Sequence, residues 1–143
     1  MFMLKAAAKY KVKRVVITSS ISAVGFVAAA VDTNTYDETS WTDVVASDYS
    51  AYNKSKVLAE EAAWNFQKKC EIAGVYCPEI VTICPSWVLG EEIAVGPSTS
   101  SSIMKKVILN EIPAYPNLHL NWCDIKDVSV AHYRGLARPE AGN

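Results

Sequence analysis

Residues 14–18 have the sequence Arg-Val-Val-Ile-Thr and are followed directly by Ser19 and Ser20. A short run rich in β-branched residues is typical of a strand buried in a parallel sheet. The Ala- and Lys-rich segment before it, residues 3–9, favours a helix. A helix followed by a buried strand predicts an α/β fold. Ser20 then lies at the carboxyl edge of the sheet, where open α/β sheets bind ligands.

The rest of the sequence continues this alternation of helices and strands. Residues 19–48 are rich in Ser, Ala, Thr and Asp, which predicts a long connection with short ordered pieces. The following elements are a helix over residues 50–70 capped by Ser47 or Asp48, a strand over 79–84 that ends before Pro85, a helix over 101–110, a short strand over 118–122, and a last helix over 126–137 capped by Asp124. With 143 residues, this order predicts a single domain.

Composition argues against several classes of protein. The chain has 14 basic and 15 acidic residues, and its one short basic stretch, KYKVKR, is too small to mark a nucleic-acid or anionic membrane surface. The longest run of small and apolar residues, 23–31, is much shorter than the ~20 residues of a membrane span, and the basic residues after an apolar start at residues 1–14 do not predict a secretory signal. The four cysteines form no C-x-x-C pair with a nearby His, so no metal site is expected. We therefore expect a cytoplasmic protein that binds neither nucleic acid nor membrane.

Tyr52 and Lys56 occur in the sequence Tyr-Asn-Lys-Ser-Lys, four residues apart near the start of the predicted long helix. Residues at this spacing share one face of a helix, so the Lys56 ammonium lies near the Tyr52 phenol. A nearby cation favours the phenolate form, which suits the phenol for proton exchange. With Ser20 at the edge of the sheet, these residues are candidate catalytic groups.

Five stretches of the chain resemble the extended short-chain dehydrogenase/reductase family: VKRVVITSSISAV, YDETSW, AYNKSKVLAEEAAW, ICPSWVLG and WCDIKDVSVAH. They cover nearly all of the chain in the order the family has them. The similarity is to the branch with dihydroflavonol reductases and cinnamoyl-CoA reductases, within the NAD-dependent epimerase/dehydratase superfamily. The Y-x-x-S-K pattern resembles the dihydroflavonol reductases, and the N-W-Y-C-Y-G-K pattern of cinnamoyl-CoA reductases is absent. The resemblance implies a Rossmann-type doubly wound parallel sheet with part of the small substrate-binding region.

The resemblance also implies an activity, the reduction of a small aldehyde or ketone to an alcohol with NADP, or with NAD. Tyr52 would donate a proton to the carbonyl oxygen, and Ser20 would hydrogen-bond the developing oxyanion. Lys56 would assist Tyr52 and bind the nicotinamide ribose. Further cofactor contacts are expected from Thr18, Ser19, Pro85, Ser86, Trp87, Val88, Ser98, Thr99 and Ser100.

The chain departs from the family pattern at its beginning. None of its six glycines forms the G-x-x-G-x-x-G turn that holds the cofactor pyrophosphate in the family. We therefore expect a single partial reductase domain, truncated at the N-terminus. In it, residues 1–84 complete the Rossmann-type half and residues 85–143 contact cofactor and substrate. Such a fragment is expected to self-associate through the strand edge at residues 15–17.

Two alternatives remain open. A sugar-nucleotide epimerase or dehydratase shares the Tyr and Lys chemistry of the wider superfamily. A truncated pseudoenzyme or interaction module would use the same fold without catalysis. His119 and His132 have no nucleophile at a recognisable spacing, and His132 is expected to be structural.

Overall fold

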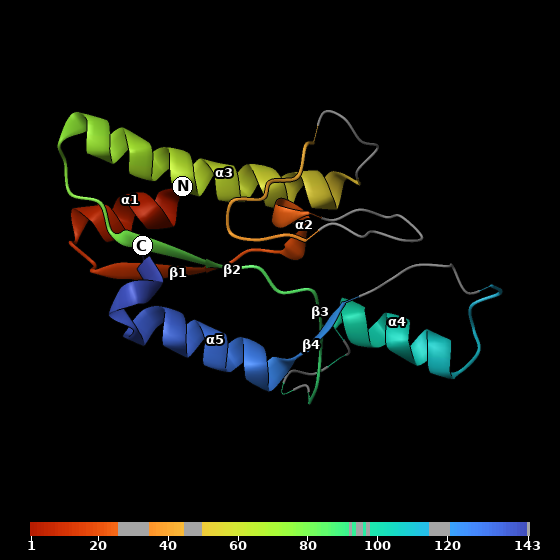
Figure 1. Cartoon of the computed structure of the whole chain (residues 1–143). Coiled ribbons are helices and arrows are strands. Elements are labelled where there is room, and N and C mark those ends of the chain that lie inside the picture. The colour runs from red at the N-terminus through yellow and green to blue at the C-terminus, as the bar shows by residue number, and fades with distance from the viewer. Residues whose placement is uncertain are drawn as a thin grey trace.

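The computed structural model describes residues 1–25, 35–44, 50–91, 93, 96, 98–114 and 121–142. The elements follow the order α1 (Phe2–Lys9), β1 (Arg14–Thr18), α2 (Ile21–Val24), α3 (Ala51–Ala73), β2 (Glu79–Ile83), β3 (Trp87–Leu89), α4 (Thr99–Ile108), β4 (Trp122–Asp124), α5 (Ile125–Ala137) and the 3-10 turn η1 (Pro139–Gly142). The predicted α/β fold is confirmed (Figure 1). No described helix is both long enough and apolar enough to cross a bilayer.

Two pairs of parallel strands organise these elements. β1 pairs with β2 from Arg14 opposite Glu79 to Thr18 opposite Ile83, and β3 pairs with β4. Helices α1 and α3 cover one face of the β1–β2 sheet and α5 covers the other, as in a doubly wound fold (Figure 1). Within the described residues, β1 has β2 as its one neighbouring strand. The self-association expected from the other edge of β1 stays a prediction.

Apolar side chains fill both faces of the β1–β2 sheet. Leu4 of α1, Ala63 of α3 and Ile80 of β2 form a buried cluster on one face. On the other face α5 approaches through Gly135, where a Cβ atom would lie 3.3 Å from a methyl group of Val81. The absence of a side chain at this position therefore lets α5 pack closely on the sheet.

The long helix begins at Ala51, within one residue of the predicted start, and ends at Ala73 rather than residue 70. Ser50 is the N-cap of α3, and its side chain accepts a hydrogen bond from the Asn53 N–H at 3.2 Å. The caps predicted at Ser47 and Asp48 lie outside the described residues. At the other end Gly74 adopts a left-handed conformation with φ 63°, which closes the helix as expected.

Two other predicted boundaries are also shifted. Helix α4 starts at Thr99 rather than residue 101, because Ser98 caps it through the Ser101 N–H. The strand predicted over 118–122 shares Trp122 with β4, which spans Trp122–Asp124, and its residues 118–120 lie outside the described part. As predicted, Asp124 caps α5 by accepting from the Lys126 N–H at 2.7 Å.

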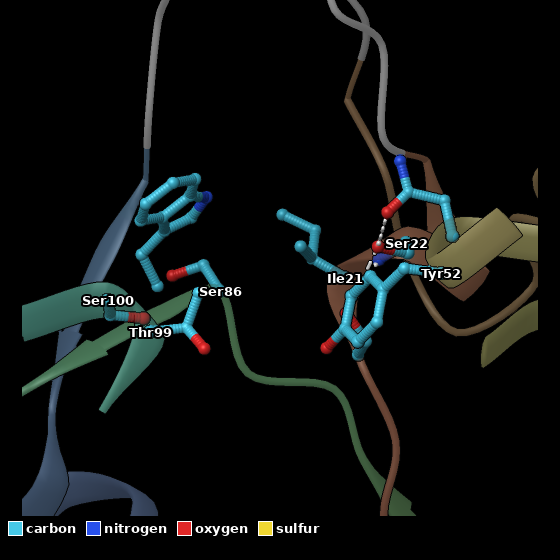
Figure 2. A pocket seen from close by; sticks show the side chains of 9 residues that line it. Ile21, Ser22, Tyr52, Ser86, Thr99 and Ser100 are labelled. Carbon is cyan, nitrogen blue, oxygen red and sulfur yellow. Dashed lines mark hydrogen bonds between the residues drawn. The ribbon is translucent and has the colours of Figure 1, made fainter. Parts of the chain in front are cut away.

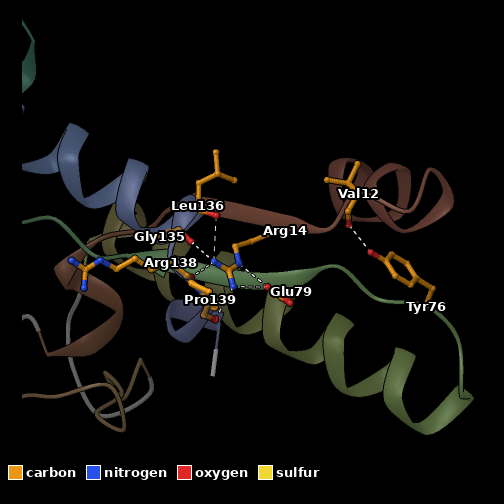
Figure 3. Close-up of polar contacts among 8 residues, drawn as sticks. All are labelled: Val12, Arg14, Tyr76, Glu79, Gly135, Leu136, Arg138 and Pro139. Atoms are coloured by element: carbon orange, nitrogen blue, oxygen red, sulfur yellow. Dashed lines mark hydrogen bonds and ion pairs between the residues drawn. The ribbon is translucent and has the colours of Figure 1, made fainter.

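A buried arginine holds α5 at the amino end of β1. Arg14 is 9% exposed, and its Nε and Nη2 lie 2.7 Å and 2.6 Å from Glu79 Oε2 (Figure 3). The guanidinium also donates to the backbone carbonyls of Gly135, Leu136, Arg138 and Pro139. These carbonyls belong to the end of α5 and the turn after it, where a helix leaves its acceptors unpaired. One cation therefore stabilises both the sheet and the end of the helix.

Replacing this cation should destabilise the fold. Arg14→Met leaves the acceptors at the end of α5 without their donor, so we expect the free energy of unfolding to fall by about 3 kcal/mol. Arg138→Met is the matched control, because both side chains of the Arg138–Glu140 ion pair are exposed. This pair should contribute less than about 1 kcal/mol to the free energy of unfolding. Denaturant titration of both variants measures the difference. Equal losses would show that Arg14 does not hold α5.

A buried carboxylate holds α3 at the other end of the sheet. Glu60 is 6% exposed and lies on α3 two helical turns after Tyr52. Its Oε2 accepts from the Ser19 hydroxyl after β1 and from the Cys84 thiol after β2, the latter at 3.5 Å. Its Oε1 accepts from Trp64 Nε1 at 3.2 Å. Glu60 therefore ties the helix to the carboxyl ends of both strands.

The surroundings of Cys84 disfavour the thiolate form of its side chain. Burial, together with the neighbouring Glu60 carboxylate, raises the pKa of Cys84 from 9.0 to about 11. Because the thiolate is the nucleophile, iodoacetamide at pH 8 should modify Cys84 about a hundredfold more slowly than a free cysteine, with the rate still rising at pH 10. Glu60→Gln should accelerate modification, though not to the free rate, since burial is the larger cause. Mass spectrometry of the modified peptides measures each rate. Fast alkylation of Cys84 at pH 7 would contradict this environment.

Candidate active site

A cleft of about 330 Å³ opens at the carboxyl end of the β1–β2 sheet. One wall comes from the start of α2 and the first turn of α3, and the other from the segment after β2 and the start of α4 (Figure 2). The lining residues are Ser20, Ile21, Ser22, Tyr52, Asn53, Ser86, Trp87, Thr99 and Ser100. Most of them carry a hydroxyl group, so the cleft offers many hydrogen-bond donors and acceptors beside two apolar surfaces.

Parallel pairing explains why residues far apart in sequence meet here. Ser20 follows β1 and Ser86 follows β2, and parallel strands end at the same edge of a sheet. Two backbone hydrogen bonds hold the segments together, from Ser19 N to Ile83 O at 2.8 Å and from Ile21 N to Pro85 O at 3.0 Å. The predicted position of Ser20 at the carboxyl edge is confirmed.

Tyr52 and Lys56 lie side by side on α3. Tyr52 is 62% exposed, and the Lys56 ammonium nitrogen lies 5.6 Å from the centre of its ring. This is the proximity that the four-residue spacing predicted. Lys56 does not itself line the cleft and lies beside it through its proximity to Tyr52.

Ser20 is held by its own turn. It is the N-cap of α2, and its Oγ accepts from the Ser22 N–H at 3.2 Å. The Ser20 hydroxyl also donates to Ser22 Oγ at 3.2 Å. The side chain of Ser20 therefore lies in a fixed position in the wall of the cleft.

The predicted site residues fall into two groups. Those that line the cleft are Ser20, Tyr52, Ser86, Trp87, Thr99 and Ser100, whereas Thr18, Ser19, Lys56, Pro85, Val88 and Ser98 lie outside its lining. Thr18 shares a 2.7 Å hydrogen bond with His132 Nε2, and His132 Nδ1 lies 2.8 Å from the Val128 carbonyl. This hydrogen bonding supports the structural role expected for His132.

Three lining residues were not predicted from the sequence: Ile21, Ser22 and Asn53. Asn53 follows Tyr52 directly, and Ser22 follows Ser20 by two residues, so both were close to predicted positions. Their contact with one another depends on the packing of α2 against α3. The sequence contained no signal for that contact.

The dimensions of the cleft suit one end of a dinucleotide. Ligand pockets commonly measure about 300–1,000 Å³, so about 330 Å³ accommodates a nicotinamide-sized ring with a small carbonyl compound. Trp87 offers an apolar surface, and Ser86, Thr99 and Ser100 offer hydroxyls. An apolar ring surface beside several hydroxyls is a donor set that fits the nicotinamide end of such a cofactor. Among the described residues, no group of His, Cys, Asp and Glu is arranged to hold a metal ion.

No family model matches the chain. Among curated proteins, the chain is 36% identical to cinnamoyl-CoA reductase CAD2 of Medicago truncatula over 123 residues, which cover 84% of this chain and 36% of that protein. It is 34% identical to cinnamoyl-CoA reductase 1 of Arabidopsis thaliana over 142 residues, which cover 98% of this chain and 40% of that protein. The chain thus spans less than half the length of these relatives.

Solved structures show the same fold. Yeast methylglyoxal/isovaleraldehyde reductase Gre2 complexed with NADPH matches with a TM-score of 0.78 at 27% identity, covering 99% of this chain and 45% of Gre2. Vestitone reductase from alfalfa, Medicago sativa, matches with a TM-score of 0.69 at 28% identity, covering 96% of this chain and 44% of that enzyme. The Rossmann-type architecture and the reductase relatives agree with the five sequence stretches. The chain belongs to the extended short-chain dehydrogenase/reductase family, in the NAD-dependent epimerase/dehydratase branch that includes the cinnamoyl-CoA reductases.

Proposed function

We propose that the protein carrying this chain reduces the carbonyl group of an aldehyde or ketone to an alcohol with NADPH. The observation that carries the proposal is the meeting of Ser20 and Tyr52 in one cleft, with Lys56 beside the phenol. The names of the similar proteins support it, since they are reductases, and one of the similar structures contains NADPH. The same reaction was expected from the sequence.

The cofactor, when bound, supplies a hydride to the carbonyl carbon. On this chain, Trp87 would contact the nicotinamide ring, and the hydroxyls of Ser86, Thr99 and Ser100 would hydrogen-bond its amide or ribose. Lys56 would bind the ribose from beside Tyr52. These residues would orient one end of the cofactor and exclude water from it.

Tyr52 and Ser20 act on the carbonyl oxygen. The Tyr52 Oη donates its proton to that oxygen while the carbon receives the hydride, so the product is a neutral alcohol. The Lys56 ammonium stabilises the negative charge left on Tyr52. Ser20 turns its hydroxyl from Ser22 to the substrate and donates a hydrogen bond to the developing oxyanion. A charged acceptor is stronger than the Ser22 hydroxyl, which favours this turn.

Removal of the phenolic hydroxyl tests this assignment. Tyr52→Phe keeps the ring but loses the proton donor, so kcat should fall by about a hundredfold or more while NADPH affinity is kept. Tyr133→Phe is the matched control, because Tyr133 lies on α5 with 70% of its surface exposed, away from the cleft. The assay follows NADPH oxidation by the native protein with small aldehydes and ketones, and with UDP- and dTDP-sugars.

The outcomes separate the possible functions. Loss of turnover in Tyr52→Phe with normal turnover in Tyr133→Phe supports carbonyl reduction through Tyr52. Full turnover in Tyr52→Phe would remove Tyr52 as the acid. Reaction with the sugar nucleotides alone would favour an epimerase or dehydratase. A native protein that binds no NADPH in a fluorescence titration would favour the non-catalytic interaction module.

A further inference from the structure

A chain of hydrogen bonds connects the two parts of one wall of the cleft, the α2 turn that carries Ser20 and the first turn of α3 that carries Tyr52. The Ser20 hydroxyl donates to Ser22 Oγ at 3.2 Å, and the Ser22 hydroxyl donates to Asn53 Oδ1 at 3.3 Å (Figure 2). Ser22 is 4% exposed and belongs to α2, whereas Asn53 belongs to the first turn of α3, next to Tyr52. The chain thus runs from one candidate catalytic residue to the neighbour of the other.

The direction of these hydrogen bonds follows from the protons available. A hydroxyl has one proton, and Ser22 uses its proton on the Asn53 carbonyl oxygen. Ser22 therefore presents a lone pair to the Ser20 hydroxyl, which donates to it until that hydroxyl turns to the substrate. The Ser22 backbone N–H holds the same Ser20 oxygen at 3.2 Å. The position of Ser20 is consequently set through Ser22, and that of Ser22 through Asn53.

This connection matters because Ser20 and Tyr52 must reach the same substrate oxygen. Among the described residues, the Ser22–Asn53 bond is the side-chain hydrogen bond between α2 and α3 at the cleft. A displacement of 1 Å between reacting groups costs up to about a hundredfold in rate. The Ser22–Asn53 bond fixes the first turn of α3 relative to the α2 turn, so its loss should lower the turnover rate.

We propose that Asn53 is a positioning residue, which holds Ser20 in register with Tyr52 through the Ser22 hydroxyl. The inference rests on the proposed function, because it assigns a role in carbonyl reduction to a residue outside the reacting groups. Neither Ser22 nor Asn53 exchanges a proton with the substrate. Their contribution is to fix the distance between Tyr52, which donates the proton, and Ser20, which hydrogen-bonds the oxyanion.

A double-mutant cycle in the native protein tests the connection. Asn53→Leu removes the acceptor at similar volume, and Ser22→Ala removes the hydroxyl while it keeps the backbone bond to Ser20. Each change should lower kcat by about tenfold with little change in KM, and the double variant should be no slower than either single variant. Asn53→Asp keeps an acceptor oxygen at the same place and should restore most of the activity. Lys54→Gln, in the same helical turn, is the control that should leave kcat unchanged.

Each outcome decides the inference. A rise in KM at constant kcat in Asn53→Leu would show that Asn53 binds substrate directly and would overturn the positioning role. Additive losses in the double variant would show that the two residues act separately, which overturns it too. A lower melting temperature with unchanged kcat would leave Asn53 with a purely structural role. Tyr52→Phe is measured in the same assay, so a failure of the proposed function can be distinguished from a failure of the inference about Asn53. If Tyr52→Phe is inactive while Asn53→Leu is unaffected, only the inference about Asn53 fails.

Discussion

The buried carboxylate of Glu60 is the constraint on which the geometry of the cleft depends. A carboxylate that is 6% exposed is costly unless donors surround it, and here they come from Ser19, Cys84 and Trp64. Ser19 follows β1 and Cys84 follows β2, so the bonds fix α3 against both strand ends. Tyr52 lies two turns earlier on the same helix, so Glu60, although outside the cleft, helps to place Tyr52 relative to Ser20 together with the Ser22–Asn53 bond.

Arg14 performs the corresponding task at the opposite end of the same sheet. It joins β1 to β2 through Glu79 and to the end of α5 through backbone carbonyls. Both charged groups are buried and both are satisfied by several partners, as buried charges require. The sheet thus has one polar anchor at each end, and the apolar packing of α1, α3 and α5 lies between them.

The strands β1 and β2 and the long helix α3 were predictable because their signals are local. A run of β-branched residues, a capping serine and a terminal glycine each act within a few residues. The short elements α2 and β3 were not predicted, since α2 depends on the cap at Ser20 and β3 on its pairing with β4. The same distinction between local signals and contacts formed on folding applies to the site. The pairing of Tyr52 with Lys56 is set by helical spacing, whereas the bond from Ser22 to Asn53 joins residues that only the folded chain brings together.

In the proposed function, a carbonyl compound meets the cofactor in the cleft beside Ser20 and Tyr52. A crystal structure of the native protein with NADP and an alcohol product tests it most directly. The product oxygen should lie within hydrogen-bond distance of both Ser20 Oγ and Tyr52 Oη, with the nicotinamide against the wall that carries Trp87. A product oxygen bound elsewhere, with Tyr52 out of reach, would contradict it.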